Sequence, residues 1–547
     1  MPTQLVQAAV ICGITWMLWR FCRQWVVKSS LDNIPGPSSN SWVYGNLSQL
    51  LALDSWPFHN HLLENYPGIA SLKGSFGSKI LYVFEPSALH HVFVKDQYIY
   101  DEGQFFFRSN ELLLGKGLLA TWGDHHRKQR KMLNPVFSPK HMRHMVPIFY
   151  DVGRLLVRAI DERVRAGAAE LDINEWMGRT ALEFVGQAGL GYSFDPLVND
   201  KADEFASSLK SFSGALAKAA IPRRILPYLP RIQGPFAGLG RWLMSKVPHD
   251  GVQTLVALAD KLWGRSTDIY SNKKVALERG ESLGERVGDG KDIMSTLLKA
   301  NMEASGEDKL AEEELIGQMG TLILAAVDTT SNALSLIMTR LAEHPDVQQK
   351  LREEILSAGA DRGLDFDALM GLPLLEAVCR ETLRMYVLSY SFRHAVRSHD
   401  VVLPLSQPIR GRDGSMIHEI HVPKDTVVVA GLLNCNRNKA IWGEDAYEWK
   451  PERFLSPLPS TVTEAKIPGV YSNLMTFLAG GRACIGFKFS QLEMKVILSL
   501  LLSKFTFEKT AQPIIWNMAG VRYPSVGKYG GKASLPMKVS LYKGAGI

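Results

Sequence analysis

Cysteine is scarce in this chain of 547 residues, which contains five: Cys12, Cys22, Cys379, Cys435 and Cys484. Their number is odd, and no two stand at the short spacing of a metal-binding pair. This argues against a disulfide framework and against a structural zinc site. The bulk of such a chain is expected in a reducing compartment, and any chemistry of a single cysteine must come from its surroundings.

Dense runs of one charge are also missing. The formal net charge is +7, and 21% of the residues are charged. No block of Lys and Arg interleaved with aromatic residues could follow a nucleic-acid backbone, so nucleic acid is not an expected partner. The hydrophobic fraction of 46% is that of a globular protein with a sizeable core, which argues against wholesale disorder.

An apolar run from Leu5 to Trp19 occupies the amino terminus. Tryptophans and then cations cluster at its end, as at a membrane–water interface: Trp16, Trp19, Trp25, Arg20, Arg23 and Lys28. A cleaved signal peptide is the alternative, but no positive charge precedes the run and no small-residue cleavage site follows it. We therefore predict one transmembrane helix within an anchor of residues 1–28, with the rest of the chain in the cytosol.

Two prolines in Ile34-Pro35-Gly36-Pro37 predict a stiff elbow over residues 29–40. We interpret residues 41–547 as one domain that is mainly α with a smaller β portion. Helical patterns run from about Ser87 to Tyr386, and the polar, glycine-rich stretch Glu278–Lys291 predicts an exposed loop. Strands are expected in three places: Lys79–Phe84, Val401–Ala430 around the turn Gly411–Gly414, and a pair after Ile514.

One cysteine, Cys484, stands between glycines and directly before the apolar helical stretch Phe487–Phe505. Glycines allow a tight turn and a close approach to a flat ligand, and Arg482 can pair with an anionic group. A helix N-terminus favours thiolate over thiol, so Cys484 could bind iron. From these residues alone, a buried structural cysteine beside a glycine turn is the alternative.

This segment resembles the haem-binding signature of the cytochrome P450 superfamily, Phe-x-x-Gly-x-Arg-x-Cys-x-Gly. Its five fixed positions are Phe477, Gly480, Arg482, Cys484 and Gly486. The chain is most similar to the microsomal eukaryotic class, and the sequence as a whole resembles that of fungal members. The resemblance implies the cytochrome P450 fold (α+β), haem b as cofactor, Cys484 as the thiolate ligand of iron, and the other four as haem-binding residues.

A second pair of motifs resembles the family's structural charge triad. Glu381-Thr382-Leu383-Arg384 matches Glu-x-x-Arg, whose two charges lie on one face of a helix. Pro451-Glu452-Arg453-Phe454 matches the partner motif, so the resemblance implies that Arg453 joins Glu381 and Arg384 behind the cysteine loop. A solvated helical charge pair is the alternative for Glu381 and Arg384 taken by themselves.

The stretch Ala325–Thr330, in an apolar helix expected from near Leu315, resembles the family's oxygen-binding Ala-Gly-x-Asp-Thr-Thr. The resemblance implies that Asp328 and Thr329 are catalytic and deliver protons. Ala326 stands where the family usually has glycine, and its methyl group narrows the groove. An Ala- and Thr-rich core helix is the alternative, but an unpaired buried carboxylate in its middle is costly.

Two parts of the chain carry residues that resemble those with which the family binds the haem propionates. His126 and Arg130 match a helix that carries Trp or His and then Arg four residues on, and Arg393 resembles a third partner. A basic solvated face is the alternative for the nearby Lys128 and Lys131, which could also face a reductase.

The resemblance implies a monooxygenase that inserts one oxygen atom of O2 into a lipophilic small molecule such as a terpenoid, steroid or other secondary metabolite. Gly238-Leu239-Gly240 follows no strand pattern and no flavin-type domain is expected, so NADPH would act through a separate NADPH-cytochrome P450 reductase. The expected location is the endoplasmic reticulum membrane. By resemblance, the substrate pocket is lined by Phe105, Phe106, Ala325, Met518 and Val521, under a lid near Ile221–Pro230.

Two other functions stay open. One is a related haem enzyme that rearranges or dehydrates an oxygenated substrate without O2, which Ala326 favours and the Asp328-Thr329 pair disfavours. The other is a haem-binding membrane protein with no enzymatic activity.

Overall fold

The computed structural model describes residues 11–12, 15–16, 19, 26–195, 197–198, 204–219, 242–279, 290–385, 391–395, 400–471 and 473–544. Of the expected anchor, Ile11, Cys12, Thr15, Trp16, Trp19, Val26, Val27 and Lys28 are described; all eight are exposed, and the first six are helical. The expected transmembrane helix therefore stays a prediction. The expected lid near residues 221–230, and residues 280–289 of the expected loop, lie outside the described part.

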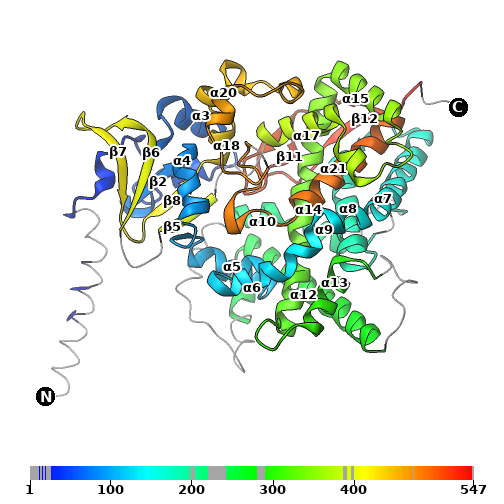
Figure 1. The fold of residues 1–547 in the computed structure, drawn as a ribbon, viewed down its shortest axis with the longest axis horizontal. Helices are drawn as coiled ribbons and strands as arrows, with labels where there is room; N and C mark the ends of the chain where they lie inside the picture. Colours follow the sequence, from blue (N-terminus) through cyan, green and yellow to red (C-terminus); the bar gives the residue numbers. More distant parts are fainter. Residues whose placement is uncertain are drawn as a thin grey trace.

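The architecture is mainly helical with a smaller sheet portion, as predicted. In Figure 1 the long helix α14 (Glu312–Glu343) runs through the middle, the main sheet lies on one side, and α7 (Pro139–Arg165) and α8 (Ile173–Phe184) lie on the other. The remaining helices of eight or more residues among those described are α3 (Trp56–Asn65), α5 (Gln104–Leu114), α6 (Gly123–Leu133), α12 (Asp250–Glu278), α13 (Ile293–Glu303), α15 (Pro345–Ala358), α17 (Pro373–Met385) and α21 (Phe487–Lys504).

Helix α14 begins where the sequence supplies the charges that a helix N-terminus favours. Three glutamates occupy its first turn, and the Glu314 carboxylate accepts the backbone N–H of Ala311 at 2.9 Å. It ends at Glu343, just before Pro345, which starts α15. Among the described helices, α14 is long and apolar enough to cross a membrane, but 67% of its apolar window is buried inside the protein. It is therefore a core helix.

The main sheet has the strand order β1-β2-β8-β5-β3. Strand β2 pairs antiparallel with β1 and parallel with β8, and the remaining pairs are antiparallel. The predicted strand and hairpin regions are confirmed by β2, by β6-β7 around residues 411–415, and by β10-β11. The strands are β1 (Ile69–Lys73), β2 (Lys79–Val83), β3 (Tyr100–Asp101), β4 (Glu170–Asp172), β5 (Ser391–Ala395), β6 (Val401–Arg410), β7 (Met416–Val422), β8 (Val427–Ala430), β9 (Phe505–Lys509), β10 (Ile514–Asn517), β11 (Tyr523–Val526) and β12 (Pro536–Leu541).

The proline elbow packs onto the main sheet. The backbone N–H of Ser71 in β1 donates to the Pro35 carbonyl at 2.8 Å, and Ile34 is buried. A Cβ atom at Gly36 would lie 1.8 Å from the Ser71 carbonyl oxygen, so only glycine permits this approach. Residues at the elbow thus contribute to the globular core as well as linking it to the amino terminus.

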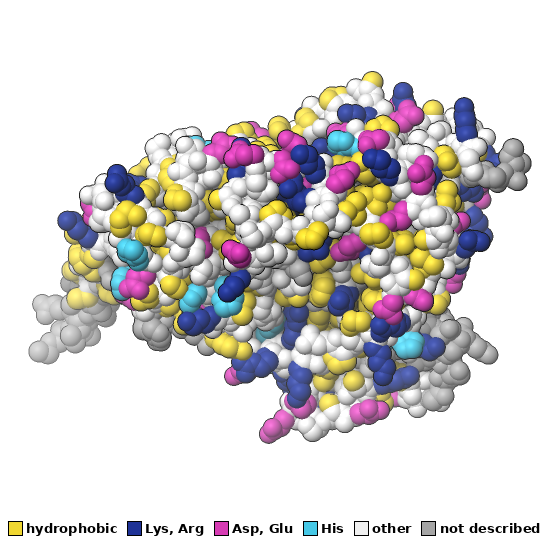
Figure 2. Space-filling view, turned by 45° about the horizontal axis from the view of Figure 1, so that its top comes forward, with side chains coloured by type: hydrophobic (Ala, Val, Ile, Leu, Met, Phe, Trp, Pro, Cys, Tyr) yellow, Lys and Arg dark blue, Asp and Glu magenta, His cyan; other side chains and the backbone are white. Residues whose placement is uncertain are grey.

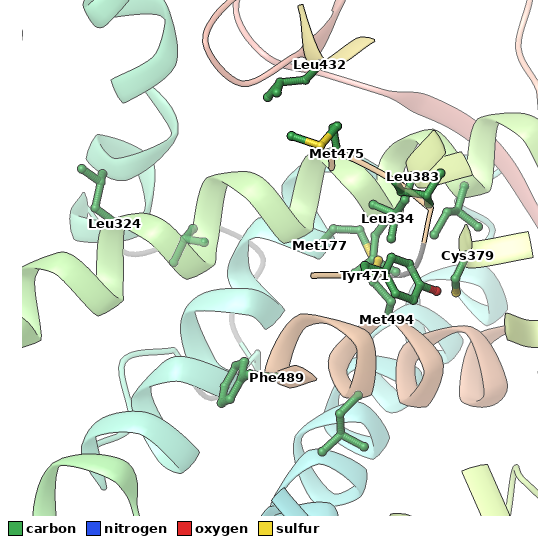
Figure 3. Close-up of a cluster of buried hydrophobic side chains, with 14 of the residues drawn as sticks. Met177, Leu324, Leu334, Cys379, Leu383, Leu432, Tyr471, Met475, Phe489 and Met494 are labelled. Carbon is green, nitrogen blue, oxygen red and sulfur yellow. The ribbon is translucent and has the colours of Figure 1, made fainter. Parts of the chain in front are cut away.

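Helices α14 and α17, which carry family motifs, share one apolar core with α21, which follows the cysteine motif. Figure 3 shows Leu324 of α14, Cys379 of α17, and Phe489 and Met494 of α21 in a single buried cluster with Met177 of α8. Burial raises the pKa of the Cys379 thiol to about 12, so this cysteine stays protonated and packs as a small apolar side chain. The core therefore fixes the positions of α14, α17 and α21 relative to each other.

A buried acid on α21 predicts an unusual dependence of stability on pH. Glu493 is fully buried, and neither carboxyl oxygen has a hydrogen-bond partner among the described residues. Burial raises its pKa well above 4.5. Between that value and the raised one, the folded protein keeps a proton that the unfolded chain loses, so the free energy of unfolding falls as pH rises.

We expect the Glu493→Gln variant, which cannot titrate, to show a smaller fall in melting temperature between about pH 5 and about pH 8 than the wild type. Differential scanning calorimetry at several pH values would measure it. An equal fall in both proteins would show that Glu493 is not the source.

Candidate active site

The loop before α21 is closed by its own backbone. The Cys484 N–H donates to the Phe477 carbonyl at 2.8 Å, and the Gly481 N–H donates to Gln97 Oε1 at 2.7 Å. Gly480 has φ +63°, and a Cβ atom there would lie 1.8 Å from the Phe93 carbonyl oxygen. Gly480 is therefore required for the loop to reach its neighbour, as its place in the motif implies.

Aromatic contacts hold the start of this loop. The Phe477 ring packs edge-on against Tyr471 at 5.8 Å and tilted against Phe487, the first residue of α21, at 6.0 Å. Tyr471 in turn donates to the Glu376 carboxylate on α17 at 2.5 Å. The loop is thus braced from both α17 and α21.

The Cys484 side chain is accessible although it lies deep in the fold. Burial raises the pKa of its thiol, and the Gly486 N–H and the charge of Arg130 offset only part of this rise. The Gly486 N–H at the start of α21 favours the thiolate, as expected from the sequence, but desolvation has the larger effect on this pKa. A bound metal cation deprotonates a coordinating thiol, so bound iron would hold Cys484 as the thiolate.

The middle of α14 has one open face. Ala325 and Thr329 are exposed, whereas Val327 and Thr330 next to them are buried. The Thr329 hydroxyl donates to the Ala325 carbonyl at 2.7 Å, the hydrogen bond into its own helix that the sequence suggests. This alcohol is consequently held at the accessible surface of an otherwise buried helix.

Asn332 holds Asp328, and Asn174 holds Asn332 in turn. The Asn332 amide donates to the Asp328 carbonyl at 2.7 Å and to its carboxylate at 3.2 Å, and accepts from the Asn174 amide of α8 at 2.9 Å. Sequence reasoning missed both asparagines. The spacing of four residues between Asp328 and Asn332 was a usable signal, because such pairs meet on a helix face.

The structure brings the three triad residues together. Arg384 makes two hydrogen bonds to the Glu381 carboxylate, at 2.7 and 2.8 Å, and both side chains are fully buried. Arg453 Nε lies 3.6 Å from Glu381 Oε1. Arg384 also donates to the carbonyls of Asn436 and Ala446, so α17 is tied to the segment that precedes the cysteine loop.

The two expected propionate partners on α6 lie beside the loop. Arg130 donates through Nη1 to the Ala483 carbonyl and through Nε to Asn134 Oδ1 at 3.2 Å. His126 is buried, and burial together with the positive charges of Arg482 and Arg130 lowers its pKa to about 3. His126 is therefore neutral and can donate one hydrogen bond.

Arg393 and Arg482 meet at a pair of acids that sequence reasoning missed, Asp101 and Glu102. Arg393 Nη1 lies 2.5 Å from Glu102 Oε1, and Arg482 Nε lies 3.1 Å from Glu102 Oε2. Arg482 Nη2 lies 3.1 Å from Asp101 Oδ1 and donates to the Thr121 carbonyl at 2.9 Å. Two adjacent acids before a Phe-rich helix were a usable signal in the sequence for a charged contact. Only the fold shows which arginines these acids contact.

These residues fit a haem. The accessible Cys484 sulfur can bind iron, and three arginines at Arg130, Arg393 and Arg482 can bind its two propionates. Arg393 Nη2 is buried and has no hydrogen-bond partner among the described residues, as a donor kept for such an anion would be. The exposed face of α14 leaves room for a flat ligand at this helix.

The five expected pocket residues differ in how far they are buried. Phe105 and Phe106 on α5 and Val521 near β11 are half-buried, and Ala325 is exposed. Met518 is buried, and its sulfur accepts from Arg522 Nε at 3.0 Å. Met518 therefore packs against an arginine, which makes it the least open of the five.

Comparison with known proteins places this site in a family. Residues 35–524 match the family model described as Cytochrome P450. Cytochrome P450 monooxygenases 91 and 81 of Postia placenta are 50% and 51% identical over 98% and 99% of this chain and 99% and 98% of their own lengths. A ganoderic acid synthetase of Ganoderma lucidum is 45% identical over 98% of this chain and 99% of its own. The chain therefore belongs to the cytochrome P450 family, as a fungal-type monooxygenase whose cofactor is haem with a cysteine thiolate on iron.

Proposed function

We propose that this protein inserts one atom of O2 into a lipophilic terpenoid or steroid, with Cys484 as the iron ligand and Asp328 and Thr329 as the proton-delivering pair. The observation that carries the proposal is the open face of α14. There Thr329 and Ala325 are exposed on an otherwise buried helix. The Asp328 carboxylate next to Thr329 accepts a hydrogen bond from Asn332.

The haem, when bound, supplies oxygen activation, which a thiolate ligand favours by pushing electron density toward O–O cleavage. The protein's own groups manage the protons. Thr329 can turn its hydroxyl from the Ala325 carbonyl toward a ligand above α14, and Asp328 can return a proton to it. Asn332 limits the motion of that acid through one hydrogen bond to its carboxylate and one to its backbone carbonyl.

The substrate class rests on the apolar residues near the site and on one relative. Phe105 and Phe106 are half-buried aromatic side chains on α5, and Ala325 adds an apolar surface on α14. A relative that is 45% identical over nearly the whole chain is named a ganoderic acid synthetase. Apolar linings of this kind suit a large hydrocarbon skeleton with few polar groups.

Electrons are proposed to come from NADPH through a membrane-bound cytochrome P450 reductase, with this chain anchored in the endoplasmic reticulum by residues 1–28. Exposed cations on α6, the helix that carries Arg130, support docking of an acidic partner: the Arg127 and Lys131 side chains are 60% and 77% exposed. Figure 2 shows basic and acidic side chains interspersed among hydrophobic ones on one face of the molecule.

Reconstitution with such a reductase in lipid vesicles tests the proposal. Adding a substrate terpenoid or steroid should increase NADPH and O2 consumption and give a product that carries one oxygen atom from ¹⁸O2. A product formed without O2 consumption would instead establish an isomerase or dehydratase.

Replacing Asp328 by asparagine should lower turnover by about 10²- to 10⁴-fold, because a positioned proton donor contributes that much. The reduced CO spectrum should stay unchanged, and a larger share of the consumed NADPH should appear as hydrogen peroxide. Asp346→Asn is the matched control, since Asp346 is an exposed acid in the first turn of α15, 3.8 Å from Lys350. Equal turnover and coupling in Asp328→Asn and the wild type would remove Asp328 from the mechanism.

A further inference from the structure

A buried carboxylate joins the two arginines that lie on different elements beside the cysteine loop. Glu102 follows β3, Arg393 is on β5, and Arg482 is in the loop itself. The Glu102 carboxylate lies 2.5 Å from Arg393 Nη1 with one oxygen and 3.1 Å from Arg482 Nε with the other. Only 8% of Glu102 and 2% of Arg393 are exposed. One acid thus bridges two cations at the place where the haem propionates would be held.

We propose that Glu102 is a positioning residue for haem: it fixes the guanidinium groups of Arg393 and Arg482 so that their remaining N–H donors face the propionates, and its charge keeps the iron harder to reduce. This inference rests on the proposed haem site. It assigns a role to a residue outside the motifs that identify that site.

The geometry of Arg393 supports positioning. Its Nη1 is engaged by Glu102 and by the Phe392 carbonyl at 3.2 Å, whereas its Nη2 has no partner in the part of the chain that the structure describes. The guanidinium also stacks on the Phe93 ring at 4.8 Å, which restricts its plane. With one edge and the plane held, Nη2 is the donor left for a further anion.

Arg482 is held in the same way. Its Nε faces Glu102, its Nη2 donates to the Thr121 carbonyl at 2.9 Å, and its guanidinium lies over the Phe107 ring at 5.2 Å. Arginine loses considerable side-chain entropy when it is ordered. When other partners already order the Arg482 side chain, binding of a propionate loses less of this entropy. This is the physical basis of a positioning role.

Two neighbouring arginines favour the ionised form of Glu102. Burial opposes its ionisation, but Arg393 and Arg482 outweigh this and lower its pKa to about 2. Burial and the neighbouring Glu102 raise the pKa of Asp101 to about 6, so Asp101 is the weaker acid of the pair. Arg393 and Arg482 thus favour the ionised form of Glu102, and a negative charge close to a bound haem would disfavour adding an electron to its iron.

Two variants separate the two parts of this role. Glu102→Ala removes both the acceptor and the charge, so haem should transfer to excess apomyoglobin at least about tenfold faster than from the wild type. Glu102→Gln keeps an acceptor for Arg393 but loses the charge, so transfer should change by less than about threefold. In Glu102→Gln the ratio of reduced to oxidised iron at a fixed potential should rise about tenfold, measured by spectroelectrochemical titration.

Glu419→Gln provides the control, because Glu419 is an exposed acid on β7 and should leave both measurements unchanged. Equal haem transfer from Glu102→Ala and the wild type would overturn the positioning role. If the alanine variant does not accumulate, an unchanged potential in Glu102→Gln overturns the proposal. Failure of the wild type to show thiolate-ligated haem would instead refute the proposed haem site, so the two failures are distinguishable.

Discussion

Replacing Cys484 by serine should abolish the red-shifted Soret band that the reduced, CO-bound wild type shows, and monooxygenase turnover should fall below detection. A thiolate pushes electron density into iron and so favours O–O cleavage, and a neutral serine hydroxyl does not replace it. The fold should persist, because the loop is closed by the backbone hydrogen bond from residue 484 to Phe477 and by the Gly481–Gln97 contact, which serine leaves intact.

Absorption spectra of dithionite-reduced, CO-treated protein check the band, and circular dichroism checks the fold. Cys12→Ser is the matched control, since Cys12 is exposed and remote in sequence from the motif. A Cys484→Ser protein that keeps the red-shifted band would eliminate Cys484 as the ligand and leave Cys22, Cys379 or Cys435 to be tested.

Replacing Arg384 by alanine should leave the protein without stable haem and cost about 3–5 kcal/mol of unfolding free energy. The change removes the two shortest hydrogen bonds to the fully buried Glu381 carboxylate, and the Lys450 N–H at 3.0 Å remains as a donor. It also frees the carbonyls of Asn436 and Ala446, which precede the cysteine loop. Thermal unfolding and the haem-to-protein absorbance ratio would measure both effects.

Arg384→Lys should rescue little, because a lysine cannot provide the two parallel hydrogen bonds to Glu381 or reach both carbonyls at once. Arg143→Ala is the matched control: its pair with Asp367 is exposed and should contribute at most about 1 kcal/mol. If Arg384→Ala loses no more stability than Arg143→Ala, the triad does not support the loop.

Much of the site could be predicted because its residues lie close together in the sequence. Gly480 and Cys484 belong to one short loop, and Asp328 and Thr329 belong to one helix turn. The strand β2 and the hairpin β6-β7 were also predictable, because alternating apolar residues and a glycine turn are local signals. The electrostatics of Cys484 were not, because burial depends on the whole fold and outweighs the helix terminus.

The partners of these residues come from distant segments. Gln97 binds the cysteine loop, Asn174 reaches Asp328 through Asn332, and Glu102 bridges Arg393 and Arg482. Gln97, Asn174 and Glu102 lie outside the motifs, and contacts between residues 158 or more positions apart leave no periodic signal in a single sequence.

By itself, then, the sequence determined the chemistry at iron and the mainly helical fold, because a ligand cysteine, its glycines and a helix pattern are local properties of the chain. Only the tertiary structure decided how that chemistry is supported. The bridge that Glu102 makes between two arginines, the hydrogen bond from Asn332 to Asp328 and the raised pKa of the Cys484 thiol arise from contacts and desolvation that exist only after the chain has packed.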